Sequence, residues 1–282
     1  MTLTVTQLYK HIDQQPVIDG VDFQLPLGQI VGLVGRNGAG KTTLMRLLAN
    51  EILPERGTIT GAESLFYLDV PDNFMKNYTL NQINKILPIT YPKYAAETFW
   101  QVIDEQKIDH NKTVGTLSKG QRALVYIAAG LASRADYILL DEPLDGLDVL
   151  IRDTVKRLLI DHLAAHESTI LIASHNLVEL DSLTDRILFM KDGQIFRDYH
   201  PGTDEKLVKV QLVFEGDQLP RDLIGNAHVL EQRGHMWVLL FESYTDETED
   251  ILDMAGLKYF EELPITSEDV FRATFEAQGG LV

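Results

Sequence analysis

The stretch Gly35-Arg36-Asn37-Gly38-Ala39-Gly40-Lys41-Thr42-Thr43 decides the fold of this chain. Residues 29–34, directly before it, are mostly apolar and are typical of a buried strand. Residues 44–49, directly after it, carry apolar side chains at helical spacing. A strand, a glycine-rich turn and a helix in this order match the pattern G-x-x-x-x-G-K-[ST] of the phosphate-binding loop.

The residue types of this loop fit phosphate chemistry. Its glycines allow the backbone to fold around a phosphate and to point successive N–H groups at it, and the N-terminus of the following helix adds the positive end of its dipole. Lys41 is placed to reach the outer phosphates, and the hydroxyl of Thr42 to bind Mg²⁺. A glycine-rich turn that binds nothing is disfavoured because both flanking elements are present. The sequence therefore predicts a site for a nucleoside triphosphate, and its candidate binding residues in this loop are Gly35, Asn37, Gly38, Ala39, Gly40, Lys41, Thr42 and Thr43.

The composition is that of an ordinary globular protein. Of the 282 residues, 45% are hydrophobic and 24% are charged, which is enough for a sizeable core. No apolar run approaches the ~18–20 residues of a membrane-spanning helix, and we expect no signal peptide at the N-terminus. The absence of cysteine excludes disulfides and thiolate metal sites. The net charge of −17 disfavours a general nucleic-acid surface and adsorption to anionic lipid.

The order of the remaining segments predicts a mainly parallel α/β sheet. Short strands and turns fill the first 33 residues, and a helical pattern from Tyr78 to about Ile108 is expected to be broken into two pieces by Pro88 and Pro92. Beyond it, strands at 137–140, 169–173 and 186–190 alternate with helices at 119–133 and 149–165.

A domain boundary is expected near residues 200–203, where Pro201 and Gly202 interrupt the pattern. The last 75 or so residues predict a small α+β domain, with strands at 208–214, 237–241 and 257–263 and a helix-opening box at 266–269. Residues 206–282 carry −9 of the net charge of −17. The sequence does not decide whether this acidic part makes a dimer contact, regulates the protein or only packs.

A second candidate site element is the apolar strand that ends in Asp141 and Glu142. Parallel sheets place their chemistry at the carboxyl ends of such buried strands. Asp141 would hold Mg²⁺, and Glu142, one residue on, would polarise an attacking water. Two solvated acids at a strand end are the alternative. They are disfavoured beside a phosphate loop, because a triphosphate site needs a metal ligand.

The segment Leu117-Ser118-Lys119-Gly120-Gln121 opens a helix with Ser118 as a suitable N-cap. Together with the phosphate loop, the strand that ends at Glu142, the segment 143–148 and Ala173-Ser174-His175, it resembles the ATP-binding subunits of ABC transporters. Lys119 stands where that family's signature has its first glycine. The resemblance covers residues 1 to about 200. It implies a P-loop NTPase core of ABC type in residues 1–203, with an N-terminal antiparallel β subdomain and a helical subdomain at about 74–134, followed by the small domain at 204–282.

The resemblance also implies how the site works. Two such domains dock head to tail, and each ATP lies between the phosphate loop of one subunit and the signature of the other. Ser118, Gly120 and Gln121 would then bind the γ-phosphate of the partner's ATP, and His175 would hold the water and Glu142 in place. The implied cofactors are ATP and Mg²⁺, with Glu142, His175 and Lys41 as the catalytic residues.

Two family features have no direct counterpart in this sequence. Ile12 stands at the aligned adenine-stacking position, with Tyr9 and His11 close by, and Tyr9 is the candidate for stacking on adenine. The region of the family's glutamine loop contains Tyr67-Leu68-Asp69-Val70-Pro71 and no glutamine. Asp69 is therefore the candidate third metal contact beside Thr42 and Asp141.

The function that this resemblance implies is an ATPase subunit of an ABC transporter, similar to exporter subunits. It would act with a separate membrane permease and with a second copy or a paralogous subunit, at the cytoplasmic face of the membrane. One alternative is a soluble ABC-type ATPase that acts on ribosomes or DNA, which the acidic charge and the single nucleotide domain disfavour. The other is a degenerate regulatory module, which the intact Lys41, Asp141, Glu142 and His175 disfavour.

Overall fold

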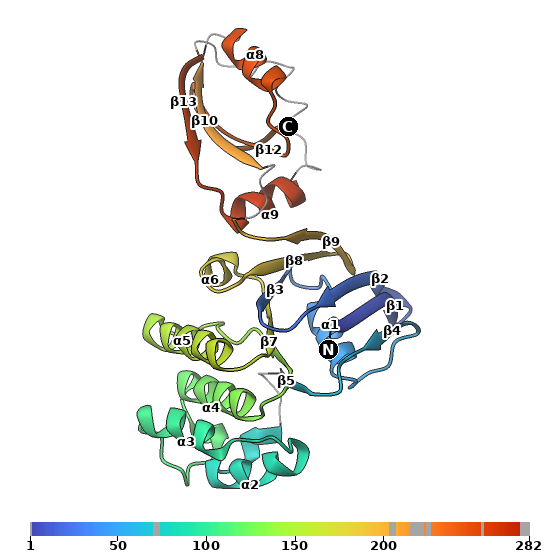
Figure 1. The fold of residues 1–282 in the computed structure, drawn as a ribbon, viewed down its shortest axis with the longest axis vertical. Coiled ribbons are helices and arrows are strands. Elements are labelled where there is room, and N and C mark those ends of the chain that lie inside the picture. Colours follow the sequence, from blue (N-terminus) through green and yellow to red (C-terminus); the bar gives the residue numbers. More distant parts are fainter. Residues whose placement is uncertain are drawn as a thin grey trace. The chain divides into compact units, whose positions relative to one another are not determined.

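The computed structural model describes residues 2–69, 74–202, 207–214, 223, 227–254 and 257–276, and only the backbone of 69, 74, 246, 247, 253, 254 and 274–276. The chain divides into two units, Met1–Tyr199 and His200–Val282 (Figure 1). Each unit has its own sheet system and its own core.

The central sheet of the first unit is built around β3 (Ile30–Val34), the apolar segment before the glycine-rich turn. The sheet has six strands in the order β5-β6-β7-β3-β8-β9. The strands parallel to β3 are β5 (Leu65–Asp69), β6 (Tyr137–Asp141), β7 (Thr169–Ser174) and β8 (Arg186–Lys191), and β9 (Gln194–Tyr199) pairs antiparallel at the edge. All residues of β3, β6 and β7 are buried, as expected for parallel strands covered on both faces. Their carboxyl ends therefore meet at one edge of the sheet.

A second, antiparallel sheet of order β2-β1-β4 packs beside it. It consists of β1 (Leu3–Ile12), β2 (Gln15–Leu25) and β4 (Arg56–Thr60), and the two residues between β1 and β2, Asp13 and Gln14, have positive φ. Apolar side chains of this sheet, of α1 (Lys41–Leu48) and of the central strands form one buried cluster. The hydroxyl of Tyr137 on β6 fastens the two sheets, because it accepts from the N–H of Leu3 (2.8 Å) and donates to the C=O of Leu25 (3.0 Å).

Helices occupy most of the chain between β5 and β6: η1 (Phe74–Asn77), α2 (Leu80–Thr90), α3 (Ala96–Glu105), η2 (Val114–Thr116) and α4 (Lys119–Ala132). The expected break at Pro88 is wrong, because α2 runs through it and ends at Thr90. Pro88 removes one N–H donor from the last turn, with only two helical residues after it, and the buried Leu80, Ile83 and Leu87 hold the helix against its neighbours in spite of that loss. The predicted break at Pro92 agrees with the non-helical segment between α2 and α3.

Two further helices follow β6 and β7. α5 (Val149–Ala165) lies within the predicted range, whereas the five-residue α6 (Leu177–Asp181) was not expected. The strand β5 was also not predicted, because a short apolar run such as residues 65–68 cannot be told from part of a buried helix by periodicity alone.

The second unit is an α+β fold, as predicted. Its sheet has the order β11-β12-β10-β13 and is antiparallel throughout. The elements are β10 (Val208–Phe214), β11 (Ala227–Arg233), β12 (Met236–Phe241), α8 (Asp246–Met254), β13 (Leu257–Leu263) and α9 (Ser267–Glu276). The expected helix-opening box is present: the N–H of Asp269 donates to Thr266 Oγ1 (3.3 Å), and the N–H of Thr266 to Asp269 Oδ2 (2.8 Å).

Candidate active site

The glycine-rich turn links β3 to α1, and its geometry requires glycine at two positions. A Cβ on Gly35 would lie 2.3 Å from the C=O oxygen of Met190. Gly40 has φ +107°, and a Cβ there would lie 2.6 Å from the C=O oxygen of Val17. Gly40 is the N-cap of α1 and provides no side-chain cap. The first N–H groups of α1 are therefore directed at the turn, in the arrangement that binds anions at helix N-termini.

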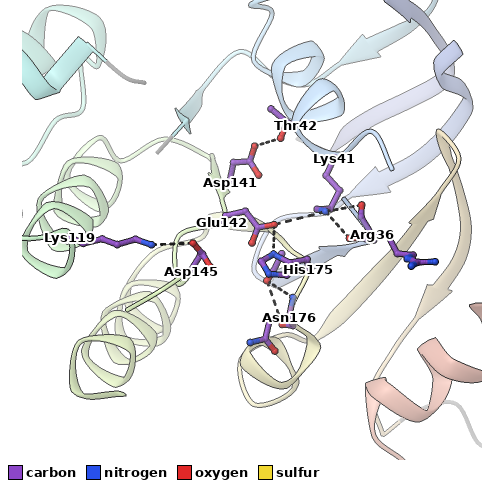
Figure 2. A network of polar contacts seen from close by, with 11 residues as sticks. Arg36, Lys41, Thr42, Lys119, Asp141, Glu142, Asp145, His175 and Asn176 are labelled. Atoms are coloured by element: carbon purple, nitrogen blue, oxygen red, sulfur yellow. Dashed lines mark hydrogen bonds and ion pairs between the residues drawn. The ribbon is translucent and has the colours of Figure 1, made fainter. Parts of the chain in front are cut away.

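Lys41 is the first residue of α1, and its side chain bends back over the turn. Its ammonium donates to the C=O groups of Gly35 (2.7 Å) and Arg36 (3.4 Å) and lies 4.0 Å from Glu142 Oε1 (Figure 2). The residue is only 7% exposed. Burial lowers the pKa of Lys41, and the charges of Glu142 and Asp141 act in the opposite direction. A cation is thus fixed beside the turn by the backbone that surrounds it.

Thr42 and Asp141 meet between α1 and the end of β6. The hydroxyl of Thr42 donates to Asp141 Oδ2 over 2.6 Å (Figure 2). Both groups are hard oxygen ligands of the kind that Mg²⁺ prefers, and this ion takes most of its remaining ligands from phosphate and water. Thr42 and Asp141 therefore fit an ion that arrives with the nucleotide. In the part of the chain that the structure describes, no group of three or more His, Asp or Glu side chains is placed to hold a metal.

Asp69, the third candidate metal contact, ends β5 and is the register partner of Asp141 in the sheet. Its backbone thus lies at the edge where the site forms. Its side chain lies outside the described residues.

Glu142 follows β6 directly, and His175 follows β7. The two strands are neighbours, which brings His175 Nδ1 within 3.0 Å of Glu142 Oε1 (Figure 2). The N–H of Glu142 donates to the C=O of Ala173 (3.0 Å), while its φ of +49° is a left-handed value that non-glycine residues adopt at a cost. The hydrogen bond and the charge of Glu142 raise the pKa of His175. One carboxylate thus faces both a cationic lysine and a histidine that it makes more basic.

The cavity at this edge has a volume of about 320 Å³ and is lined by Val17, Asn37, Gly38, Gly40, Lys41, Thr42, Thr43 and Glu142. The structure therefore brings most of the predicted loop residues and Glu142 to one space. Gly35 and Ala39 act through the backbone: the C=O of Gly35 accepts from Lys41, and the C=O of Ala39 accepts from the N–H of Gly193 (3.1 Å). Val17 was missed by the sequence analysis, because a single aliphatic residue in a strand carries no chemical signal.

Tyr9 does not line this cavity, so the expectation that it faces the nucleotide finds no support in the geometry. Its ring lies against Gly20 of β2, where a Cβ would come within 2.9 Å of the Tyr9 hydroxyl. That hydroxyl donates to Gln7 Oε1 (3.3 Å). Val17 and Ile18 of β2 both lie against Gly40 of the glycine-rich turn, and Val17 also lines the cavity.

Ser118, Gly120 and Gln121 are grouped at the N-terminus of α4, away from the residues that line the cavity. Ser118 and Gln121 form a capping box, in which the N–H of Gln121 donates to Ser118 Oγ (3.2 Å) and the N–H of Ser118 to Gln121 Oε1 (3.3 Å). Lys119 donates to Asp145 Oδ2 (3.1 Å), three residues after Glu142 (Figure 2). These residues form a second, separate surface of the same unit.

Comparison with known proteins gives a consistent picture. Residues 18–145 match the family model described as "ABC transporter". The chain is 32% identical over 285 aligned residues to the ABC transporter ATP-binding protein YtrB of Bacillus subtilis, covering 97% of this chain and 98% of that protein. It is 31% identical to the aliphatic sulfonates import ATP-binding protein SsuB of Rhodopseudomonas palustris, covering 70% of this chain and 74% of that protein.

Solved structures show the same fold. The ATP-binding subunit of an ABC transporter superposes with a TM-score of 0.64 at 21% identity, covering 73% of this chain and 91% of that one. The dimeric bacterial ABC transporter cassette MJ0796 superposes with a TM-score of 0.62 at 19% identity, covering 70% of this chain and 98% of that one.

Proposed function

This chain belongs to the family of ABC transporter ATP-binding proteins, which hydrolyse ATP to drive transport, and we propose that it works as a head-to-tail dimer on a separate membrane permease. The observation that carries the proposal is that Lys41, Thr42 and Glu142 line one cavity, with Asp141 in contact with Thr42 and His175 in contact with Glu142. Each of these side chains has a distinct task in hydrolysis at a phosphate.

The glycine-rich turn and the start of α1 would bind and position the phosphates of ATP. The N–H groups at the start of α1 and the ammonium of Lys41 would bind the β- and γ-phosphates, because they present fixed positive charge in a partly buried site. Thr42 and Asp141 would hold Mg²⁺, which neutralises charge that develops on the phosphate oxygens. Asp69 is a further candidate for this contact.

Glu142 is the residue we propose for activating water. Its carboxylate faces the cavity beside Lys41 and would accept a proton from the attacking water. His175 would keep that carboxylate in position through the 3.0 Å contact of Nδ1 with Oε1. In the nucleotide complex its Nε2 would be directed at the γ-phosphate.

The second surface supports the proposal of a head-to-tail dimer. Ser118, Gly120 and Gln121 lie at a helix N-terminus that does not reach the cavity of its own chain. In a head-to-tail pair, this helix end would close the partner's cavity over the γ-phosphate. The similar MJ0796 cassette is itself dimeric. We propose residues 1–203 as the unit that dimerises, with a helical subdomain at about 74–134 and a small domain at 204–282.

The test of the site is the Glu142→Gln variant, with Glu63→Gln as a control at a carboxylate remote from the cavity lining. We expect Glu142→Gln to abolish steady-state ATP hydrolysis and to form a stable dimer with Mg-ATP, as measured by size-exclusion chromatography with light scattering. Glu63→Gln should behave as the wild type. Unchanged turnover in Glu142→Gln would remove Glu142 from the proposed role.

We propose that the permease is a separate chain. Among the described residues no helix is long and apolar enough to cross a membrane. We propose that the protein is held at the cytoplasmic face of the membrane through that permease. Affinity purification from gently solubilised cells should recover a polytopic membrane protein in stoichiometric amount. Recovery of ribosomes or DNA instead would favour the alternative of a soluble ATPase.

We propose separately that the direction of transport is export. The single nucleotide domain and the short second unit suggest export, while the SsuB relatives are named as import proteins. The name of YtrB, which matches both units, states no direction. Uptake into inside-out vesicles that contain the purified permease complex would support export, and ATP-dependent loss from such vesicles would contradict it.

A further inference from the structure

A second cavity, larger than the nucleotide cavity, lies at the opposite edge of the central sheet. It has a volume of about 570 Å³. Its walls come from the segment that leads into α3, the residues between α4 and β6, and the end of α5 with the turn into β7. β6 and β7 begin at this cavity and end at Asp141 and Ser174 beside the nucleotide cavity. The walls are joined by backbone hydrogen bonds of 2.8 Å, from Ala95 to Ala132 and from Thr169 to Asp136.

Two buried polar atoms in the lining have no hydrogen-bond partner among the described residues. They are His162 Nε2 and Ser168 Oγ, on side chains of residues that are 6% and 2% exposed. A buried polar group without a partner destabilises the fold, so such groups are rare unless something binds them. Both residues line the cavity. The two atoms themselves have almost no accessible surface, so a bound molecule would contact them after a χ1 rotation of Ser168 and a rotation of the His162 ring.

Arg134 brings a positive charge to the same place. Its backbone has φ +53°, a left-handed value at the end of α4 where glycine or asparagine is usual. The guanidinium contacts the ring of His166 (2.7 Å to Nδ1) and Thr98 Oγ1 (3.4 Å). These contacts hold the guanidinium over the cavity and leave N–H donors unused, since the group has five.

The charges around the cavity distinguish its floor from its rim. We define the floor as Arg134, His162, His166 and Ser168. Burial, His166 and Arg134 lower the pKa of His162 to about 4, and burial and Arg134 lower the pKa of His166. Both imidazoles are therefore neutral near pH 7, and Arg134 supplies the formal charge of the floor.

The carboxylates of the cavity lie at its rim, which we define as Lys93, Glu97, Asp136 and Glu167. Asp136 is paired with Lys93 (3.8 Å), and Glu97 and Glu167 face the solvent. This rim disfavours a second negative charge at the outer end of a ligand. A transition metal is disfavoured at this cavity for two reasons. The positive guanidinium of Arg134 lies beside the His166 ring, and the described residues contain no group of three metal-binding side chains.

We propose that the floor is a binding site for a compact oxyanion, either a phosphate or a carboxylate group of a small molecule. Arg134 neutralises it, while the hydroxyl of Ser168 and the Nε2–H tautomer of His162 donate to its oxygens. The site is independent of the nucleotide cavity and occupies the other end of the two strands that carry the proposed catalytic residues.

The experiment uses the full chain with Lys41→Ala, so that phosphate does not bind at the glycine-rich turn. Inorganic phosphate and acetate are titrated separately at pH 7 while the imidazole signals of His162 and His166 are followed by NMR, with assignment through His162→Gln. We expect a saturable shift of both signals. Saturation by phosphate alone identifies a phosphorylated ligand, and saturation by acetate alone a carboxylic acid.

Two variants show whether the shift comes from this site. Arg134→Gln should abolish it, whereas Arg157→Gln, which removes a charge outside the cavity lining from α5, should not. Ser168→Ala removes a hydroxyl without a described protein partner, so the fold should keep its melting temperature while the affinity for the anion falls about tenfold. A shift that survives in Arg134→Gln, an affinity unchanged in Ser168→Ala, or the absence of any saturable shift in the folded protein would overturn the proposal.

Discussion

The ion pair between Arg152 and Glu179 should be one of the strongest single side-chain links in the first unit. Arg152, in the first turn of α5, donates to the C=O of Leu147 (3.1 Å) and lies 3.2 Å from Glu179 Oε1 on α6. It thereby ties the segment after Glu142 to the helix after His175. The Glu179 side chain is only 7% exposed and that of Arg152 29%.

The expected strength follows from distance and burial. Two unit charges 3.2 Å apart attract by about 5 kcal/mol at an effective dielectric constant of 20. Desolvation of the buried carboxylate offsets a large part of this, which leaves a coupling free energy of about 2 kcal/mol. Glu179→Gln should lower the free energy of unfolding by more than that coupling, because it leaves the partly buried charge of Arg152 without a counter-ion.

The assay is a double-mutant cycle of Arg152→Met and Glu179→Gln, with the free energy of unfolding measured in urea. The two tryptophans, Trp100 and Trp237, lie in different units. A Trp237→Phe background therefore restricts the fluorescence signal to the first unit, which matters because a chain of two units need not unfold in one step.

The matched control is the ion pair of Lys119 and Asp145. Its distance is nearly the same, 3.1 Å, but its side chains are 53% and 54% exposed. A cycle of Lys119→Met and Asp145→Asn should give a coupling below about 0.5 kcal/mol. If the Arg152–Glu179 coupling is no larger than this control, burial does not strengthen the pair and the reasoning is refuted.

Three further outcomes are expected. Tyr137→Phe leaves two buried backbone groups without their partner and should lower the free energy of unfolding by about 1–3 kcal/mol; a loss below 0.5 kcal/mol, roughly, would contradict this. Glu142 raises the pKa of His175 above 6.5, so Glu142→Gln should lower it, as followed by NMR titration without nucleotide. By linkage, protonated His175 stabilises the folded state below pH 6.5, and this contribution is lost as the pH rises through the raised pKa. Gly146→Ala, at φ +60° with its Cβ 2.4 Å from the ammonium of Lys119, should cost about 1 kcal/mol in the same urea assay, whereas an unchanged midpoint would show that this turn relaxes.

The parts of the site that the sequence predicts are those built from neighbouring residues. The glycine-rich turn is such a case, because the φ of Gly40 and the close approach at Gly35 require glycine locally. The position of Glu142 directly after an apolar strand is another. In both cases the residue type and its neighbours determine the geometry, and the structure shows the turn, the strand and the helix where the pattern placed them.

The parts that depend on strand order were not predictable in this way. The contact of Glu142 with His175 exists because β6 and β7 are adjacent, and a single sequence does not contain that adjacency. The family resemblance supplied it. At Pro88 the local pattern was misleading. The low helix propensity of proline predicted a break, but the packing of the apolar face of α2 keeps the helix intact through Pro88.

The second cavity could be predicted neither from local sequence patterns nor from the family resemblance. His162 and His166 are four residues apart, a spacing that predicts only that they share one face of a helix. The cavity arises because α3, the end of α4 and the start of β7 converge on that face, and none of these contacts is local. The fold does not need Arg134, because glycine would suit its left-handed backbone better. Nor does it need the hydroxyl of Ser168, which has no partner among the described residues. The left-handed backbone of Arg134 and the unpartnered hydroxyl of Ser168 both cost stability, and a bound molecule explains these costs better than packing does.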